Sequence, residues 1–489
     1  MNINVTAKTP AAKATVLTAL IDLGADRPLF DKRVAREHPA AADLARRRRG
    51  GGLNKPYLAV GDAPLLYLPA QAAKFWDNDE KVRILAARAY NEALARGSAS
   101  LAIPLDGPAG PAAAPLVAEG LALAAYRFDK YKGTADGEKD LSVKLIASPP
   151  GEVREAIQGR LQVIESVNRA RDLVNEPGSV ATPAEVEARA RQVAEAAGLK
   201  ITVLDDKELA KKGYEGLVTV GRGGNVPPRM IVLKYTPAGA KRGKGPHLGL
   251  LGKGLTFDTG GVSIKPASKM WEMKGDMSGA AAVLYAIEAI AAAEAPIPVT
   301  AVIVTAQNYV DANSVVPGDI IRARNGKTIH IDNTDAEGRL ILTDGLWRMG
   351  EEKVTHLVDV ATLTGACLRA LGTSLSGVFG NDDFANRLAD VAGAQGEPCW
   401  RLPLVEEYSE WIKCDIADLN NISTRGPNAG ATTAALFLRE FVPAGVHWAH
   451  LDIAGTFIAE KPWKYFKPGA TGVMVRTLTA LAGAISSDA

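Results

Sequence analysis

Acidic and basic side chains that could act together in catalysis are concentrated in two glycine-rich segments, residues 251–280 and 332–340. Four carboxylates and three cationic groups lie there: Asp258, Asp276, Asp335 and Glu337, with Lys253, Lys265 and Arg339. Four carboxylates in one crevice would repel one another unless cations neutralise them. Oxygen-rich ligand sets suit divalent metals, and two neighbouring metals can polarise one water molecule. These residue types therefore predict a two-metal hydrolytic site.

Helix capping is a competing explanation for some of the same residues. Thr334, followed three residues later by Glu337, forms a capping-box pattern that would satisfy donors at a helix N-terminus. Asp276 precedes an alanine-rich run and belongs to the preferred N-cap residues. Capping does not explain Asp258 or Lys253. Both interpretations remain open from the spacing alone.

The elements that must position these residues follow an α/β pattern, because apolar β-branched runs alternate with alanine-rich stretches. Strands are expected at residues 98–104, 141–147, 230–235, 247–251, 299–305, 356–361 and 448–453, and helices at 81–96, 120–130, 276–293 and 337–351. Such apolar runs favour a mostly parallel sheet covered by helices on both faces. The two chemical segments would then lie at the carboxyl ends of strands, where open α/β sheets bind ligands.

The segment Ser148-Pro149-Pro150-Gly151 interrupts this pattern and predicts a domain junction. We expect a smaller N-terminal α/β domain at residues 1–150, with an oligomerising or regulatory role. A larger catalytic α/β domain would follow at residues 151–489, beginning with a helix that runs through Arg171.

Composition excludes several classes of protein. The 489 residues are 47% hydrophobic and 23% charged, as in ordinary globular proteins. The net charge of +2 is too balanced for wholesale binding to nucleic acid or a membrane surface. Three cysteines build neither a disulfide framework nor a cysteine-rich zinc site. Signal-peptide and membrane-span patterns are lacking, since the most apolar stretch, residues 285–306, is broken by glutamates and prolines. We expect a cytoplasmic protein.

The chemical segments resemble the leucine aminopeptidase (cytosol aminopeptidase) family. Residues 333–340, N-T-D-A-E-G-R-L, match the family's signature octapeptide without a break. The spacing of the first segment's residues also agrees with the family pattern: Lys253, Asp258, Lys265 and Asp276. Further similarity at 171–177, 227–229, 361–365 and 450–455 extends the resemblance over roughly residues 165–480.

The resemblance implies a metal-dependent aminopeptidase that removes the N-terminal residue of peptides, preferably Leu, Met or another apolar residue. Two divalent ions, zinc or manganese, would be bound, one by Lys253, Asp258, Asp276 and Glu337, the other by Asp258, Asp335 and Glu337. Lys265 would donate to the developing oxyanion. Arg339 would hold a bicarbonate ion that acts as proton shuttle.

The resemblance also implies where the substrate lies and how the chain assembles. The substrate pocket maps to Met273, Thr362, Leu363, Gly365, Ala454 and Phe457. Many family members carry Met where this chain has Phe457, which leaves the preferred first residue open. The family forms homohexamers, so a homohexamer is expected.

A second hypothesis is an additional role as a DNA-binding regulator, which some bacterial relatives of this family have. Its local support is the run Arg46-Arg47-Arg48-Arg49, because arginine clusters bind phosphate. A solvated loop or helix end and a protein interface are the alternatives for this run. An electrophoretic mobility shift with steep salt dependence would support DNA binding, and no shift at low salt would contradict it.

Overall fold

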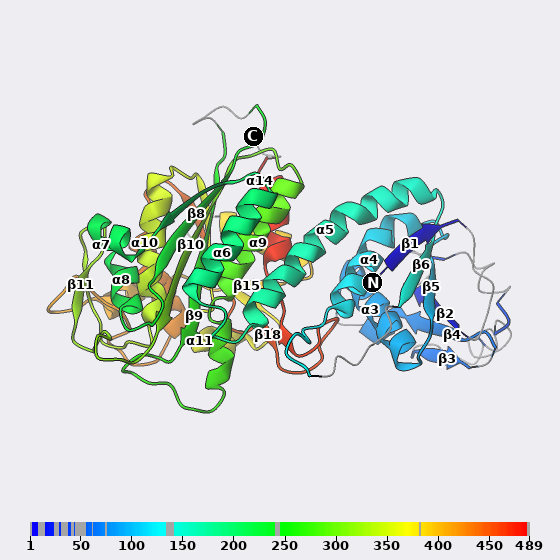
Figure 1. Ribbon diagram of the computed structural model, residues 1–489, viewed down its shortest axis with the longest axis horizontal. Helices are drawn as coiled ribbons and strands as arrows, with labels where there is room; N and C mark the ends of the chain where they lie inside the picture. The colour runs from blue at the N-terminus through cyan, green and yellow to red at the C-terminus, as the bar shows by residue number, and fades with distance from the viewer. Residues whose placement is uncertain are drawn as a thin grey trace. The chain divides into compact units, whose positions relative to one another are not determined.

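The computed structural model shows two units, each built around its own sheet (Figure 1). It describes residues 2–7, 15–23, 29–30, 38–40, 44, 55–60, 62–73, 76–133, 141–239, 245–380 and 383–486. The first unit comprises Met1–Glu165 and Glu460–Pro468, and the second Ser166–Ala459 and Gly469–Ala489. The expected α/β fold with a smaller and a larger part is confirmed.

The domain boundary at residue 150 stays a prediction. The long helix α5 (Pro150–Asn175) begins at this residue, and the boundary between the two units lies inside that helix, between Glu165 and Ser166.

The first unit contains a six-stranded sheet in the order β1 (Asn2–Thr6), β6 (Ser142–Ile146), β5 (Ser100–Pro104), β2 (Val16–Asp22), β4 (Leu65–Pro69) and β3 (Tyr57–Ala59). Its described neighbours pair in parallel except β3 with β4. Besides the start of α5, the helical elements among this unit's described residues are η1 (Ala70–Ala73), α3 (Asn78–Ala95) and α4 (Gly110–Ala125). The predicted helix at 120–130 was wrong in its bounds. Pro111 suits the first turn of α4, and Tyr126 adopts a non-helical ψ of 138° that ends it.

The segment Glu460–Pro468 belongs to the first unit because a buried cation anchors it there. Lys464 Nζ lies 2.9 Å from Glu80 Oε1, and both side chains are almost fully buried. The same ammonium lies 3.7 Å from the ring centroid of Trp76. An ion pair and a cation–π contact thus compensate the cost of burying this charge.

The second unit contains an eight-stranded sheet in the order β15 (Cys399–Arg401), β14 (Ser376–Gly380), β17 (His447–Asp452), β13 (His356–Ala361), β9 (Leu248–Asp258), β10 (Val299–Asn308), β8 (Arg229–Tyr235) and β7 (Lys200–Leu204). The four central strands, β17, β13, β9 and β10, run parallel, and β14 and β8 flank them in the antiparallel direction. Short strands form two small further sheets: β11 (Ile320–Arg322) with β12 (Thr328–His330) and β16 (Leu419–Asn420), and β18 (Ile458–Ala459) with β19 (Gly469–Ala470).

Helices cover both faces of this sheet (Figure 1). Besides the end of α5, the second unit contains the helices α6 (Pro183–Ala196), α7 (Asp206–Lys212), α8 (Glu215–Gly221), α9 (Ser278–Ala292), α10 (Glu337–Glu351), α11 (Gly365–Leu371), α12 (Phe384–Ala394), α13 (Gly430–Arg439) and α14 (Val475–Ser486), with the 3₁₀ segments η2 (Met270–Gly275) and η3 (Glu406–Ile412). The predicted helix at 337–351 matches α10, and the predicted helix at 276–293 matches α9 within two residues.

Strand β9 extends to Asp258, beyond the predicted strand at 247–251. The predicted end of this strand at residue 251 was wrong, because residues 252–258 of the glycine-rich segment continue it. The glycines serve helix packing instead, because a Cβ on Gly252 would lie 2.6 Å from the carbonyl oxygen of Gly279 in α9. Since strand side chains alternate between faces, Lys253 lies on the opposite face, against α10.

The stretch Met270–Ala292, which includes α9, is long and apolar enough to cross a membrane by length and composition alone. In the structure 89% of its most apolar window is buried inside the protein. This burial is that of a core helix in a globular unit.

Helix α10 is linked to α8 through the buried carboxyl of Asp344, which accepts a hydrogen bond from Leu217 N at 2.7 Å. Burial raises the pKa of Asp344 to about 8. The folded protein therefore keeps this proton over a pH range in which the unfolded chain loses it. Stability contributed by the protonated carboxyl is complete below about pH 4 and is lost as the pH rises through about 8.

Asp344→Asn keeps an acceptor oxygen but cannot ionise. We expect its midpoint of thermal unfolding to rise relative to that of the wild type as the pH is raised from about 5 to about 8. The control Asp390→Asn, at an exposed position of α12, should show no such trend. A constant offset between Asp344→Asn and wild type across this range would contradict the assignment.

Candidate active site

The carboxyl ends of the central strands bring polar residues to one edge of the second unit's sheet. β9 ends at Asp258, β10 at Asn308 and β17 at Asp452, and Thr362 directly follows β13. Because these strands are parallel, residues distant in the sequence meet at this edge. The predicted position of the chemical segments at strand ends agrees with this arrangement.

Lys253 lies at the centre of the cluster with its side chain 3% exposed. Its Nζ is 2.9 Å from Asp276 Oδ1 and 3.1 Å from Glu337 Oε1, and it donates to the carbonyl oxygen of Thr362 at 2.9 Å. The lysine reaches these partners past the first turn of α10. A Cβ on Gly338 would lie 2.5 Å from Lys253 Cε, so a side chain there would displace the lysine from these partners.

Lys265 bridges the other two carboxylates. Its Nζ lies 2.7 Å from Asp258 Oδ2 and 2.5 Å from Asp335 Oδ1. The second oxygen of Asp258 is fixed by two donors, Gly260 N and Asn308 Nδ2, each at 2.8 Å. The orientation of Asp258 is thus determined by neighbouring backbone and side chain.

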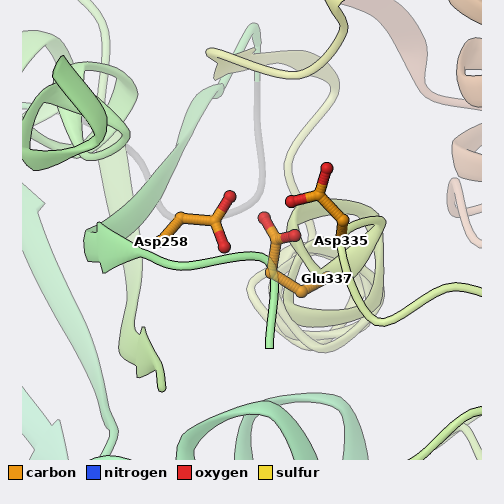
Figure 2. A group of neighbouring side chains, drawn as sticks. All are labelled: Asp258, Asp335 and Glu337. Atoms are coloured by element: carbon orange, nitrogen blue, oxygen red, sulfur yellow. The ribbon is translucent and has the colours of Figure 1, made fainter. Parts of the chain in front are cut away.

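Asp258, Asp335 and Glu337 point toward one another, the first from the end of β9 and the others from the start of α10 (Figure 2). One oxygen of each lies within 4.8 Å of the others, a spacing that can hold a metal ion. The buried Glu337 Oε2 has no hydrogen-bond partner among the described residues. Buried charged oxygens are costly without a partner, and a divalent cation would supply one. The residues present therefore fit metal ions.

The electrostatics of the cluster also favour added positive charge. Burial, together with repulsion by Asp258, raises the pKa of Glu337 to about 8. Burial likewise raises the pKa of Asp276 to about 6, although Lys253 opposes this rise. Burial lowers the pKa of Lys253, but attraction to Asp276 and Glu337 outweighs it, so the net pKa is raised. The two lysine ammonium groups only partly neutralise the four carboxylates.

Capping does not explain these residues. The N-cap of α10 is Ala336, without a side-chain cap, and the hydroxyl of Thr334 instead accepts from Ser263 N at 2.8 Å. Helix α9 begins after Met277, also without a side-chain cap. The carboxylate of Asp276 accepts from the hydroxyl of Thr362 at 2.7 Å and faces Lys253. The capping hypothesis was wrong at both positions.

A cavity of about 400 Å³ is lined both by this cluster and by apolar side chains. Its lining includes all thirteen residues predicted to be catalytic, metal-binding or substrate-binding: Lys253, Asp258, Lys265, Met273, Asp276, Asp335, Glu337, Arg339, Thr362, Leu363, Gly365, Ala454 and Phe457. It is also lined by residues that were not predicted: Pro266, Ser268, Lys269, Met270, Glu272, Ala336, Gly338, Thr364 and Leu368. Volumes of this size accommodate small ligands.

Asp452 supports the cavity and was missed from the sequence. Its buried carboxylate accepts from Leu363 N at 3.2 Å, from the hydroxyl of Thr364 at 2.7 Å and from Ala454 N at 3.1 Å. It thereby ties together the two loops that line one side of the cavity. The available signal was an aspartate next to the last residue of the predicted strand 448–453.

Arg339 is buried, and its Nη1 donates to the carbonyl oxygen of Asn421 at 2.8 Å. Burial lowers its pKa to about 10. Its buried Nε has no hydrogen-bond partner among the described residues. Asn421, also missed from the sequence, orders the signature segment by accepting from Asp332 N at 2.9 Å and donating to the carbonyl oxygen of Asn333 at 2.7 Å.

Comparison with known proteins agrees with the geometry. The model of the cytosol aminopeptidase family, catalytic domain, matches residues 168–479. The chain belongs to this family. A probable cytosol aminopeptidase of Streptomyces avermitilis is 42% identical over 412 residues, which cover 82% of this chain and 79% of the relative. One from Geobacter sulfurreducens is 44% identical over 367 residues, 74% of this chain and 73% of the relative.

A solved structure, the bottromycin maturation enzyme BotP in complex with Mn, is similar with a TM-score of 0.81. It is 33% identical, and the match covers 97% of this chain and 100% of that one. Members of the cytosol aminopeptidase family are metal-dependent exopeptidases. This family member is therefore a hydrolase that acts on peptide bonds and requires metal.

Glu337→Gln preserves the shape of the side chain and removes its charge. Because Glu337 faces both Asp258 and Lys253, we expect Mn²⁺ affinity to fall by about 10-fold or more. Isothermal titration of metal-stripped protein with Mn²⁺ measures this. Glu195→Gln, at an exposed position of α6, is the control and should bind as the wild type does. Equal affinity of Glu337→Gln and wild type would contradict the site.

Proposed function

We propose that this family member removes an apolar N-terminal residue, preferably Leu or Met, from peptides. The observation that carries the proposal is that one cavity is lined by both the carboxylate–lysine cluster and apolar side chains. Met273, Leu363 and Phe457 are apolar lining residues that suit an aliphatic side chain, while the cluster suits a charged amine and a reacting carbonyl. Peptide substrates with a free N-terminus meet both requirements.

Asp276 is the proposed partner of the substrate's free α-amino group. Its carboxylate is buried, is oriented by the hydroxyl of Thr362, and lines the same cavity as Met273. A cationic amine would be attracted to it, whereas a blocked amine would bring no charge. This explains why cleavage would be restricted to chain ends.

Two divalent ions, zinc or manganese, would supply Lewis-acid activation of water and of the scissile carbonyl. Lys253, Asp258, Asp276 and Glu337 would hold one ion, and Asp258, Asp335 and Glu337 the other. Lys253 must be neutral to act as a ligand, and nearby dications would favour loss of its proton.

Lys265 is the proposed donor to the developing oxyanion. Its ammonium lies among Asp258 and Asp335, whose attraction outweighs the effect of burial and raises its pKa. It therefore stays cationic and lines the cavity where charge would develop.

Arg339 is the proposed holder of a bicarbonate ion, which would supply a base for proton transfer. Its guanidinium lines the cavity and keeps an unpartnered buried Nε within the described structure. A buried donor of this kind fits an anion.

Lys265→Met tests the chemistry. We expect the Mn²⁺-loaded wild type to hydrolyse Leu-p-nitroanilide but not N-acetyl-Leu-p-nitroanilide, because the latter lacks the amine. Lys265→Met should lower kcat by about 10²–10³-fold. Lys211→Met, exposed on α7, is the control. Cleavage of the blocked substrate at the same rate would contradict an aminopeptidase, and wild-type kcat in metal-saturated Lys265→Met would contradict the role of the lysine.

We further propose a homohexamer located in the cytoplasm, in line with the family resemblance and with the names of the relatives. Size-exclusion chromatography with light scattering should give about six times the 51.5 kDa chain mass. A monomer would contradict the hexamer.

DNA binding stays a hypothesis from the sequence, because the arginine run 46–49 lies outside the described residues.

A further inference from the structure

The segment Arg171–Pro177, which resembles the family pattern, has no role in the chemistry described above. Asn175 is the last residue of α5 and is buried. Its side-chain Oδ1 accepts from Ala470 N at 2.9 Å, and its carbonyl oxygen accepts from Lys274 Nζ at 2.6 Å. One residue is thus bonded to two parts of the chain that lie about two hundred residues apart.

The first of these parts is the wall of the substrate cavity formed by η2. Lys274 lies between Met273, which lines the cavity, and Gly275, and the next residue is Asp276. The bond from Lys274 to Asn175 therefore restrains the wall that carries both an apolar contact and the proposed amine partner.

The second part is the wall that carries Phe457. Ala470 lies in β19, which pairs with β18 immediately after Phe457. The next residue, Thr471, donates twice to this segment. Its backbone N–H donates to the carbonyl oxygen of Phe457 at 3.0 Å, and its hydroxyl donates to the carbonyl oxygen of Thr456 at 2.7 Å. Arg171 Nε adds a bond to the carbonyl oxygen of Ala470 at 2.9 Å.

The two walls meet in direct contact. A Cβ on Gly275 would lie 2.4 Å from Phe457 Cε2, so the phenyl ring packs against the glycine without room for a side chain. Gly469 has a φ of 123°, and a Cβ there would lie 2.9 Å from Asn175 Oδ1. The spacing of the walls therefore depends on close approach at Gly275 and at Asn175.

We propose that Asn175 is a positioning residue that determines side-chain specificity, because it ties the η2 wall to the Phe457 wall and so sets the width of the cavity between these two walls. It does not line the cavity. This inference rests on the proposed aminopeptidase function. Loss of the tie would let Phe457 and Met273 separate, which weakens contacts to a large apolar residue more than to a small one.

Asn175→Ala removes the bond to Ala470, and Lys274→Met removes the bond to the Asn175 carbonyl. In each variant we expect the ratio of kcat/KM for Leu-p-nitroanilide to that for Ala-p-nitroanilide to fall by about 10-fold, mainly through KM for the leucyl substrate. Asn175→Asp keeps the Oδ1 acceptor and should retain a ratio close to that of the wild type.

Asp205→Ala controls for simple destabilisation. It removes the capping box of α7 in the same unit, which lowers stability, and Asp205 does not line the cavity. Its ratio should equal that of the wild type. If the wild type cleaves both anilides and neither Asn175→Ala nor Lys274→Met changes the ratio, the positioning role is wrong while the proposed function stands. If the wild type cleaves no unblocked anilide, the proposed function is wrong and the inference fails with it.

Discussion

The concentration of negative charge where β9 ends and α10 begins is the constraint on which the rest of the second unit depends. Four carboxylates are held at one edge of a sheet, and two of them, Asp258 and Glu337, are almost fully buried. Such an arrangement is tolerable only if cations are close. Lys253 and Lys265 provide part of that charge in the folded chain, and metal ions fit what remains.

The supporting residues around the cluster keep these charges in place. Asn308 and Gly260 N bind Asp258, Thr362 binds Asp276, and Asn421 orders the turn before α10. Each of these partners comes from a different strand end or loop. The geometry of the site is therefore a property of the whole parallel centre of the sheet, and the charge cluster could not be preserved on a shorter fragment of it.

The sequence predicted the fold class, five of the eight strands of the second unit's large sheet, and the thirteen candidate residues that line the cavity. This was possible because buried strands are continuous apolar runs and the acidic and basic candidates lie in two compact segments. The predictions from the sequence were wrong where tertiary packing, and not the local residue pattern, determines the structure. The glycines of β9 predicted an early end of the strand at residue 251, yet they lie within the strand and allow α9 to pack closely against it. Thr334 and Glu337 looked like a cap, yet their side chains bind elsewhere.

The sequence also did not predict the residues that support the site by positioning other residues. Asp452 and Asn175 lie in segments that resemble the family pattern, yet the partners that reveal their roles lie tens or hundreds of positions away. Only the assembled sheet and loops bring those partners together. Spacing patterns cannot reveal such contacts, since they have no fixed local period.

The close packing of the Lys253 side chain against Gly338 limits which substitutions homologous sequences can carry at these two positions. Any side chain at 338 would occupy the space of the lysine's Cε and Nζ. The two positions are therefore sterically interdependent: a larger residue at 338 would require the lysine to move away from Asp276 and Glu337, or a shorter residue to replace it. Among homologous chains, Lys253 and Gly338 should therefore be conserved together or replaced together. A homologue in which one of them has changed could keep the fold but lose the ability to use metal ions.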